Sequence, residues 1–327
     1  MNKILIIQTA SIGDVILATP VLEKLHHYFP DAQIDFLLKK GTESLFEGHP
    51  FLHEVLIWDK RSHKFLNFDK LMHHIWYAKY DIIVNLQRFF LTGLMTAISR
   101  AGMRIGFDKN PLSFCFTKKI PHSIGSGIHE IKRNLSLISE ITDDIAIMPR
   151  IYPSQSDLNH VATMKTGRYY TISPASLWFT KQYPLEKWVE FAKHISFDAA
   201  IYLLGASCDS DLCDSIIGQA SHPGMKNIAG KLTFLQSAGL MKDAKMNFTN
   251  DSAPLHLASA VNAPVTAIYC STVPEFGFGP LSDSSHVVQI TEKLSCRPCG
   301  LHGYKACPEK HFKCAFDINS EQLSQYL

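Results

Sequence analysis

The fold is decided by residues 3–25, which read KILIIQTASIGDVILATPVLEKL. Residues 3–8 contain a continuous aliphatic run, Ile4–Ile7, as expected of a strand that is buried on both faces of a parallel sheet. A short turn follows, and from residue 15 apolar side chains recur along one stripe of a predicted helix, which Pro30 ends. A strand, a tight turn and a helix in this order indicate the start of a βαβ unit.

The same alternation continues to about residue 148 and then restarts. Further strands are predicted at residues 33–38, 55–58 and 80–86, with a helix at 68–78. Pro149, Pro153 and Ser154 interrupt the pattern and indicate a linker. Beyond it, strands are predicted at residues 169–173, 199–204, 246–249 and 264–270, and helices at 184–195, 234–241 and 254–261. We therefore expect an α/β chain of two doubly wound parallel-sheet domains, residues 1–152 and 153–327.

Composition narrows the class of protein. The 327 residues are 46% hydrophobic and 19% charged, which is ample for two cores. A net charge of +2 gives no reason to expect nucleic acid as a partner. The N-terminal apolar run is too short for a signal peptide, and no apolar run reaches the length of a membrane span. These features favour a cytoplasmic protein, and a monomer is expected.

Ligands of open parallel sheets bind beyond the carboxyl ends of the strands, so the turns there are the places to look for a site. The first is Ser11-Ile12-Gly13-Asp14. Gly13 permits a tight turn or the close approach of a ligand. Asp14 is placed to take a proton from an attacking hydroxyl group. An Asp at the start of a helix is also a common cap, and on position alone the cap is favoured.

The second turn is Ser173-Pro174-Ala175-Ser176, followed by Lys181. Small residues with free backbone amides suit a pyrophosphate, and Ser173, Ala175 and Ser176 are candidate donors to it. Lys181 is placed to neutralise charge on a leaving phosphate. The alternative is an ordinary solvated lysine.

The third turn, Asp251-Ser252-Ala253-Pro254, leads into a helix that carries His256. Proline is tolerated in a first helical turn, and the amides of Ser252 and Ala253 there form a predicted anion site. Asp251 would accept hydrogen bonds from sugar hydroxyls. A capping role for Asp251 or Ser252 and a structural role for His256 are equally open.

A cysteine-rich loop, residues 296–314, contains four of the eight cysteines: Cys296, Cys299, Cys307 and Cys314. Four thiolates in a small loop are able to bind structural zinc. With a single Cys-x-x-Cys pair, thiols that merely pack the loop are as well supported. We expect no cofactor and leave the zinc site open.

Together these segments resemble the ADP-heptose:lipopolysaccharide heptosyltransferases, glycosyltransferase family 9. The resemblance runs in order through nearly the whole chain, and its most specific element is residues 251–258. The matching segments are Ser11-Ile12-Gly13-Asp14-Val15, Thr19-Pro20-Val21-Leu22, Tyr80-Asp81-Ile82-Ile83-Val84-Asn85-Leu86-Gln87, Arg104-Ile105-Gly106-Phe107, His129-Glu130, Asn134-Leu135, Lys181-Gln182-Tyr183-Pro184, Ala229-Gly230-Lys231, Asp251-Ser252-Ala253-Pro254-Leu255-His256-Leu257-Ala258, Ser271-Thr272-Val273-Pro274 and Gly279-Pro280.

The resemblance implies a GT-B fold and an inverting, metal-independent transfer of heptose from ADP-heptose to a lipopolysaccharide inner-core acceptor. The N-terminal domain would take the acceptor, a lipid A–core precursor, with Asp14 as general base, and the C-terminal domain the nucleotide sugar. Lys181 would contact the donor phosphates, Ser252 and Ala253 would hold the pyrophosphate, and Asp251 would lie near the sugar. Lys231 joins the predicted substrate-binding residues through its matching segment.

Three points stay open at this stage. The family often has a cation where Gln8 stands and Gly where Ala253 stands. A transferase or epimerase that uses another nucleotide sugar, or a non-catalytic sugar-binding homologue, shares the architecture. Because the implied acceptor is a lipid, we expect peripheral contact with the inner face of the inner membrane. The alternative is that the residues concerned form an ordinary solvated surface. The residues that would make this contact are Lys60, Arg61, Lys64, Phe65, Arg88, Phe89 and Phe90.

Overall fold

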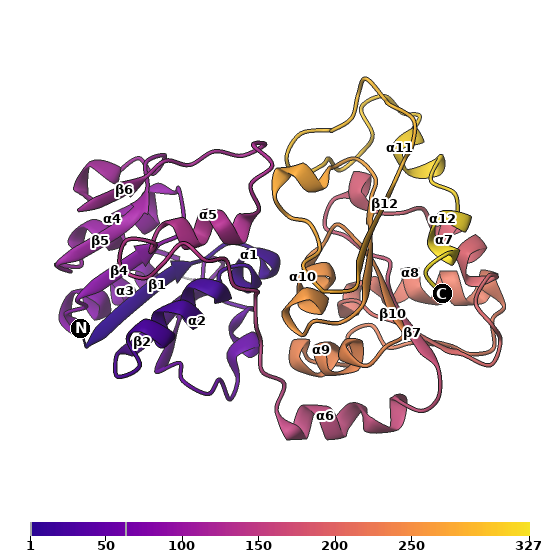
Figure 1. Cartoon of the computed structure of the whole chain (residues 1–327), viewed down its shortest axis with the longest axis horizontal. Helices are drawn as coiled ribbons and strands as arrows, with labels where there is room; N and C mark the ends of the chain where they lie inside the picture. Colours follow the sequence, from indigo (N-terminus) through magenta and orange to yellow (C-terminus); the bar gives the residue numbers. More distant parts are fainter. Residues whose placement is uncertain (1, 63) are drawn as a thin grey trace. The chain divides into compact units, whose positions relative to one another are not determined.

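The computed structural model describes residues 2–62 and 64–327. The chain divides into two compact units, Met1–Tyr152 and Pro153–Leu327. Each unit contains a six-stranded sheet flanked by helices (Figure 1). All strand pairs are parallel, and each sheet has the doubly wound order of a Rossmann-like domain. The predicted fold class of two Rossmann-like parallel-sheet domains is confirmed.

The sheet of the first unit is ordered β3-β2-β1-β4-β5-β6. Its strands are β1 (Lys3–Gln8), β2 (Gln33–Lys39), β3 (Glu54–Trp58), β4 (Ile82–Asn85), β5 (Met103–Phe107) and β6 (Lys118–Ile120). β1 lies between β2 and β4, and the side chains of residues 4–7 are 0% exposed. Burial on both faces explains why this strand is aliphatic without alternation.

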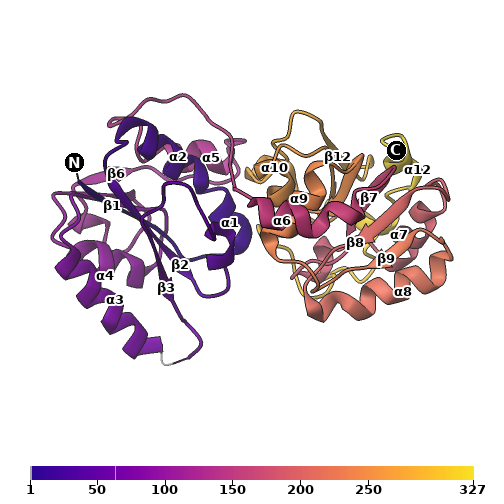
Figure 2. The ribbon, with the colours of Figure 1, turned by 90° about the horizontal axis from the view of Figure 1, so that it is seen from below.

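Helices cover both faces of this sheet. They are α1 (Ile12–Ile16), α2 (Thr19–Tyr28), α3 (Lys64–Ala78), α4 (Phe90–Ile98) and α5 (Glu130–Ser136), with short 3-10 turns η1 (Glu43–Phe46) and η2 (Ser113–Cys115). Figure 2 shows α3 and α4 on one face and α2 and α5 on the other. Leu5 and Ile7 of β1 belong to the same buried cluster as Ile75 of α3 and Met95 of α4.

The predicted single helix at residues 15–29 is wrong, because the structure has two helices there, α1 and α2. Pro20 has no N–H to donate to the carbonyl of Ile16, four residues earlier. The Thr19 hydroxyl donates to that carbonyl instead, at 2.8 Å. The missing backbone bond therefore separates α1 from α2.

The sheet of the second unit is ordered β12-β11-β10-β7-β8-β9. Its strands are β7 (Tyr169–Ser173), β8 (Ala200–Leu203), β9 (Met225–Asn227), β10 (Met246–Asn250), β11 (Val265–Tyr269) and β12 (Ser285–Gln289). Numbered within its own unit, this is the same order as in the first sheet, with β7 in the place of β1 and β10 in the place of β4.

The second unit is built around a large aromatic core. Trp188 and Phe191 of α7 (Leu185–Ala192) and Phe248 of β10 are fully buried in it. The other helices are α6 (Gln155–Val161), α8 (Ser210–Ala220), α9 (Phe234–Lys242), α10 (Ala253–Ala260), α11 (Lys313–Phe316) and α12 (Glu321–Ser324). The 3-10 turns are η3 (Ala162–Met164), η4 (Phe179–Lys181), η5 (Ser207–Asp209) and η6 (Pro274–Phe276).

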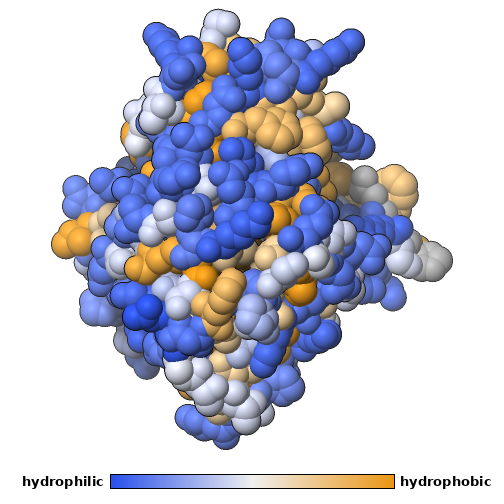
Figure 3. All heavy atoms as spheres, turned by 90° about the vertical axis from the view of Figure 1, so that its right-hand side faces the viewer, coloured by the Kyte–Doolittle hydropathy of each residue, from blue (hydrophilic) through white to orange (hydrophobic). Residues whose placement is uncertain are grey.

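The face drawn in Figure 3 is mainly hydrophilic, with isolated hydrophobic residues across it. Among the described residues, no helix is long and apolar enough to cross a bilayer.

Candidate functional site

Each sheet has a switch point, where neighbouring strands lead into helices on opposite faces. In the first unit it lies between β1 and β4, and in the second between β7 and β10. The turns that leave the carboxyl ends of such strands diverge and leave a crevice for a ligand. Three of the turns singled out in the sequence, after β1, β7 and β10, lie at these two switch points.

At the first switch point, Asp14 forms the helix cap that its position predicted. Its Oδ2 accepts hydrogen bonds from the backbone N–H of Ser11 at 3.0 Å and from the Ser11 hydroxyl at 2.5 Å. Gly13 is buried within α1. Both capping bonds go to one oxygen, and Oδ1 takes part in neither. The cap is thus compatible with a proton-accepting role, which stays a prediction.

Neutral amide and hydroxyl groups line the adjoining strand ends. Gln8, Thr9 and Gln87 are all at most 4% exposed. The Thr9 hydroxyl and the side-chain amide of Gln87 lie 2.6 Å apart across β1 and β4. Lys60, which follows β3, donates from Nζ to the Thr9 carbonyl at 2.7 Å and to its hydroxyl at 2.9 Å. A cation therefore lies one residue from Gln8. From the sequence, Lys60 was a candidate for membrane contact or for an ordinary solvated surface.

A second carboxylate of this unit lies within electrostatic range of Asp14. Glu130, the first residue of α5, is ion-paired with Arg133, and both side chains are at most 10% exposed. Burial raises the pKa of Glu130, and the negative charge of Asp14 adds to that rise, while Arg133 opposes it. In the sequence, Glu130 stands out only as part of a matching segment.

At the second switch point, the structure brings Lys181 and Asp251 together. Lys181 Nζ lies 2.7 Å from Asp251 Oδ2, and the two side chains are 15% and 8% exposed. The Thr272 hydroxyl donates to the same oxygen at 2.6 Å. Lys181 is therefore no ordinary solvated lysine, and Asp251 is held by a charged and a neutral donor.

The start of α10 directly follows Asp251 in the chain. Ser252 is the N-cap residue and makes no side-chain capping bond, and α10 starts at Ala253. Backbone N–H groups at such a helix start favour anions. Ser173, at the end of β7, is 1% exposed, and its hydroxyl has no partner among the described residues. These groups form a candidate anion site around Lys181.

The remaining predicted binding residues are placed differently. Ala175 and Ser176 are half-buried in the turn after β7, where the Ser176 carbonyl accepts from the Gln182 side chain at 2.6 Å. His256 is 4% exposed and packs edge-on against Phe278, which suits a structural role. Lys231 follows the edge strand β9, and its Nζ donates to the Asn227 carbonyl at 2.8 Å. Its substrate-binding role stays a prediction.

The four clustered cysteines are free thiols. Cys314 is buried in the core of the second unit, and burial raises its pKa to about 12. Cys296 Sγ lies 3.9 Å from His311 Nε2. Within residues 2–62 and 64–327, no three metal-binding atoms of this loop lie within 4.8 Å of one another. The thiols contribute to packing, and the zinc alternative stays untested.

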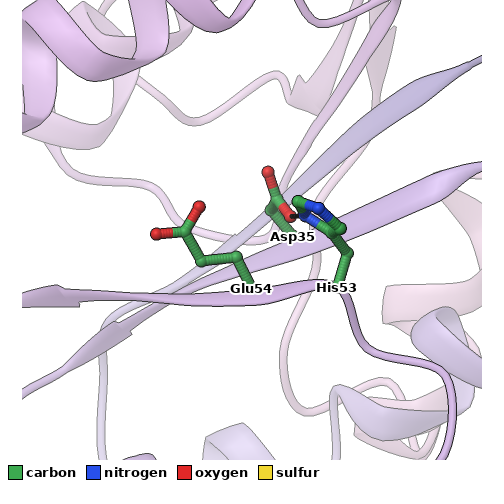
Figure 4. A group of neighbouring side chains, drawn as sticks. All are labelled: Asp35, His53 and Glu54. Atoms are coloured by element: carbon green, nitrogen blue, oxygen red, sulfur yellow. Dashed lines mark hydrogen bonds and ion pairs between the residues drawn. The ribbon is translucent and has the colours of Figure 1, made fainter.

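One group of metal-ligand type does meet that distance: Asp35, His53 and Glu54 (Figure 4). It lies at the amino ends of β2 and β3, the sheet edge opposite the switch point. Asp35 is 4% exposed. Its Oδ2 accepts a hydrogen bond from the Tyr80 hydroxyl at 2.6 Å, and its Oδ1 lies 2.8 Å from His53 Nδ1. These two contacts explain how the buried carboxylate is stabilised without an ion.

Comparisons with known proteins identify the family of this chain. Residues 68–306 match glycosyltransferase family 9 (heptosyltransferase). Lipopolysaccharide heptosyltransferase 3 of Escherichia coli is 28% identical over 277 residues, which are 80% of this chain and 81% of that protein. Lipooligosaccharide heptosyltransferase 2 of Campylobacter jejuni is 23% identical over 326 residues, 98% of this chain and 96% of that protein.

Two solved structures share the fold over 99% of this chain. Escherichia coli ADP-heptose lipopolysaccharide heptosyltransferase II superposes with a TM-score of 0.80 at 20% identity over 97% of its own chain. A family 9 glycosyltransferase of Veillonella parvula superposes with a TM-score of 0.86 at 19% identity over 96% of its chain. The family match covers most of the sequence, and this chain belongs to glycosyltransferase family 9, the heptosyltransferases.

Proposed function

We propose that this chain transfers a heptose from ADP-heptose to an inner-core sugar of a lipopolysaccharide precursor, with inversion at the anomeric carbon. The family and the lipopolysaccharide heptosyltransferases among its relatives support the sugar and the acceptor class. The observation that carries the chemistry is the Lys181–Asp251 pair beside the start of α10. It offers a cation and backbone amides to a diphosphate.

In this mechanism the second unit binds the nucleotide sugar. Lys181 and the amides of Ser252 and Ala253 balance the charge that grows on the departing diphosphate, so the step is proposed to need no metal ion. Asp251 orients the Lys181 ammonium group toward the diphosphate. We expect Lys181→Met to weaken donor binding and to lower turnover.

The first unit supplies the base. Asp14 takes the proton of the acceptor hydroxyl as the oxygen attacks the anomeric carbon, the new C–O bond forms, and the bond to the diphosphate breaks on the opposite face. Oδ1 is the proposed proton acceptor, because Oδ2 already accepts two bonds from Ser11.

The test compares two matched aspartates. Asp157 caps α6 through the same two kinds of hydrogen bond that Asp14 accepts at α1, from the Ser154 N–H at 2.9 Å and from the Ser154 hydroxyl at 2.6 Å. Asp14→Asn should lower turnover by about 10²–10⁴-fold, the usual worth of a general base. Asp157→Asn should lose a similar cap, about 1 kcal/mol, and keep its turnover. Equal turnover in the two variants would show that Asp14 is only a cap.

The assay also separates the alternatives of function. If product forms from ADP-heptose and a lipid A–core precursor, and no product forms without this acceptor, the result supports transfer. Product formed from the nucleotide sugar alone would indicate an epimerase, and donor binding without product a non-catalytic homologue.

We also propose that Lys60 supplies the cation that Gln8 lacks. Its Nζ already lies at the end of β1, on Thr9. An inner-core acceptor carries phosphate and carboxylate groups, which such a cation attracts. Lys60→Gln should raise KM for the acceptor and leave KM for ADP-heptose unchanged. A rise in both would place Lys60 outside acceptor binding.

Contact with the membrane is proposed at the turn after β4. Phe89 and Phe90 are 61% and 53% exposed there and follow Arg88, so an apolar pair and a cation are adjacent. Replacing both phenylalanines by Ser should reduce co-sedimentation with anionic vesicles. Unchanged co-sedimentation would assign the turn to an ordinary solvated surface.

A further inference from the structure

Four consecutive backbone carbonyls, at residues 269–272, mark the end of β11 and the turn that follows it. The Arg297 guanidinium donates to three of them, at 3.2, 2.7 and 2.7 Å. The fourth accepts from the backbone N–H of Cys299 at 2.8 Å. Arg297 also donates to Gln289 Oε1 on β12 at 2.7 Å. One short segment of the cysteine-rich loop thus holds the whole turn.

This turn determines where the Thr272 hydroxyl lies. The carbonyl of Thr272 is one of the three that Arg297 binds, and its hydroxyl donates to Asp251, which is ion-paired with Lys181. A continuous series of hydrogen bonds therefore runs from Arg297 to the candidate donor site. Arg297 acts in it through Thr272.

The same loop also holds the other partner of the ion pair. The Tyr304 N–H donates to Thr180 Oγ1 at 2.7 Å, and the Thr180 N–H donates to the Tyr304 carbonyl at 3.1 Å. Thr180 directly precedes Lys181. A Cβ on Gly303 would lie 2.9 Å from Thr180 Oγ1 and 3.1 Å from Lys181 Cγ, so the loop packs directly on this segment.

We propose that residues 296–304 brace the Lys181–Asp251 pair and that Arg297 is a positioning residue for the nucleotide-sugar site. The proposal rests on the proposed function, because it takes this pair to bind the donor diphosphate. Arginine suits the role because its planar guanidinium spreads five N–H donors over several acceptors. A lysine ammonium donates from a single atom and cannot span the same carbonyls.

The test measures binding of ADP by calorimetry to the full chain and to four variants. Thr272→Val removes the hydroxyl at similar volume and should weaken ADP binding about tenfold, whereas Thr272→Ser keeps it and should bind like the wild type. Arg297→Lys should weaken binding about as much as Thr272→Val. Because the two residues act in series, Arg297→Lys with Thr272→Val should be no weaker than either alone.

Arg104→Lys is the matched control. Arg104 also donates to backbone carbonyls, those of Cys115 at 3.0 Å and Ala101 at 2.5 Å, but it belongs to the first unit. Its variant should bind ADP normally. In transfer assays, Arg297→Lys should raise KM for the donor and leave KM for the acceptor unchanged, a split that general destabilisation would not produce.

Several outcomes overturn the proposal. Normal ADP binding by Arg297→Lys would do so, as would losses that multiply to about a hundredfold in the double variant. If Arg297→Lys does not fold, Gln289→Leu, which removes one partner of the guanidinium, takes its place with the same expectation. If the wild-type chain binds ADP but the affinities of the variants differ from those predicted, only the proposed brace is refuted. A wild-type chain that binds no ADP refutes the proposed function with it.

Discussion

Replacing Lys181 by Met tests how much of the second unit's stability depends on its buried ion pair. The substitution leaves Asp251, 8% exposed, with the Thr272 hydroxyl but without its cation. Removing one partner of a buried pair costs about 3–5 kcal/mol, since the remaining charge is desolvated and unpaired. Lys181 is 15% exposed, so water relieves part of that penalty. We expect a loss of about 3 kcal/mol in the free energy of unfolding.

Neutralising the partner should recover most of this loss. In Lys181→Met with Asp251→Asn, the asparagine Oδ1 still accepts from Thr272 and no buried charge remains. The expected loss relative to the wild type is then about 1 kcal/mol, near the value of one hydrogen bond. The double variant should nevertheless bind ADP-heptose as poorly as Lys181→Met, because the cation is absent from both.

Urea denaturation followed by tryptophan fluorescence measures these differences, because Trp188 is 0% exposed in the core of the second unit. The chain has two units, so two transitions are expected, and the second unit's transition alone should shift. If the double variant is as unstable as the sum of the two single variants, the pair is not coupled and the burial argument is wrong.

Three further predictions concern the first unit. Arg133→Met should destabilise it by about 3 kcal/mol, since Glu130 is left buried without its cation, and a chemical denaturation midpoint equal to the wild type's would contradict this. Gly106→Ala should cost about 1–3 kcal/mol, because the added Cβ would lie 2.4 Å from the Phe116 ring, and Phe116→Leu in the same chain should recover part of that loss in thermal unfolding. Burial lowers the pKa of His49 to about 4, so the folded state binds fewer protons than the unfolded state between about pH 6.5 and 4, and the unit should lose stability as the pH falls through this window. His49→Phe should flatten that dependence, and an unchanged slope would assign it to other groups.

The sequence predicts strands well where burial is complete. Residues 4–7 are aliphatic throughout and residues 169–173 are all buried, because both faces of these central strands are covered. The structure has strands at the bounds that the sequence predicts, 3–8 and 169–173. The strands β5, β6, β9 and β12 were missed. β9 has three residues and β12 is only partly buried, so neither carries a sustained apolar pattern.

The candidate site was predictable as a set of positions and not as a set of contacts. Lys181 and Asp251 were found because each follows a strand, but their ion pair depends on β7 lying next to β10, which no local pattern reveals. Arg297 was overlooked for a different reason. It lies inside a Cys-x-x-Cys pair that drew attention to its thiols, and the backbone carbonyls that it binds lie 25 to 28 residues away.

The two switch points have the same strand order but differ in their electrostatics, and this difference supports the roles that we propose for them. Asp251 has its charge balanced by Lys181, which suits a group that orients a cation for a diphosphate and not one that takes a proton. Both hydrogen bonds to Asp14 come from neutral groups of Ser11, so they orient the carboxylate without cancelling its charge. A base must keep that charge until the acceptor oxygen attacks. Of the two carboxylates, Asp14 therefore fits proton removal, and the fixed cation in the second unit fits the leaving group.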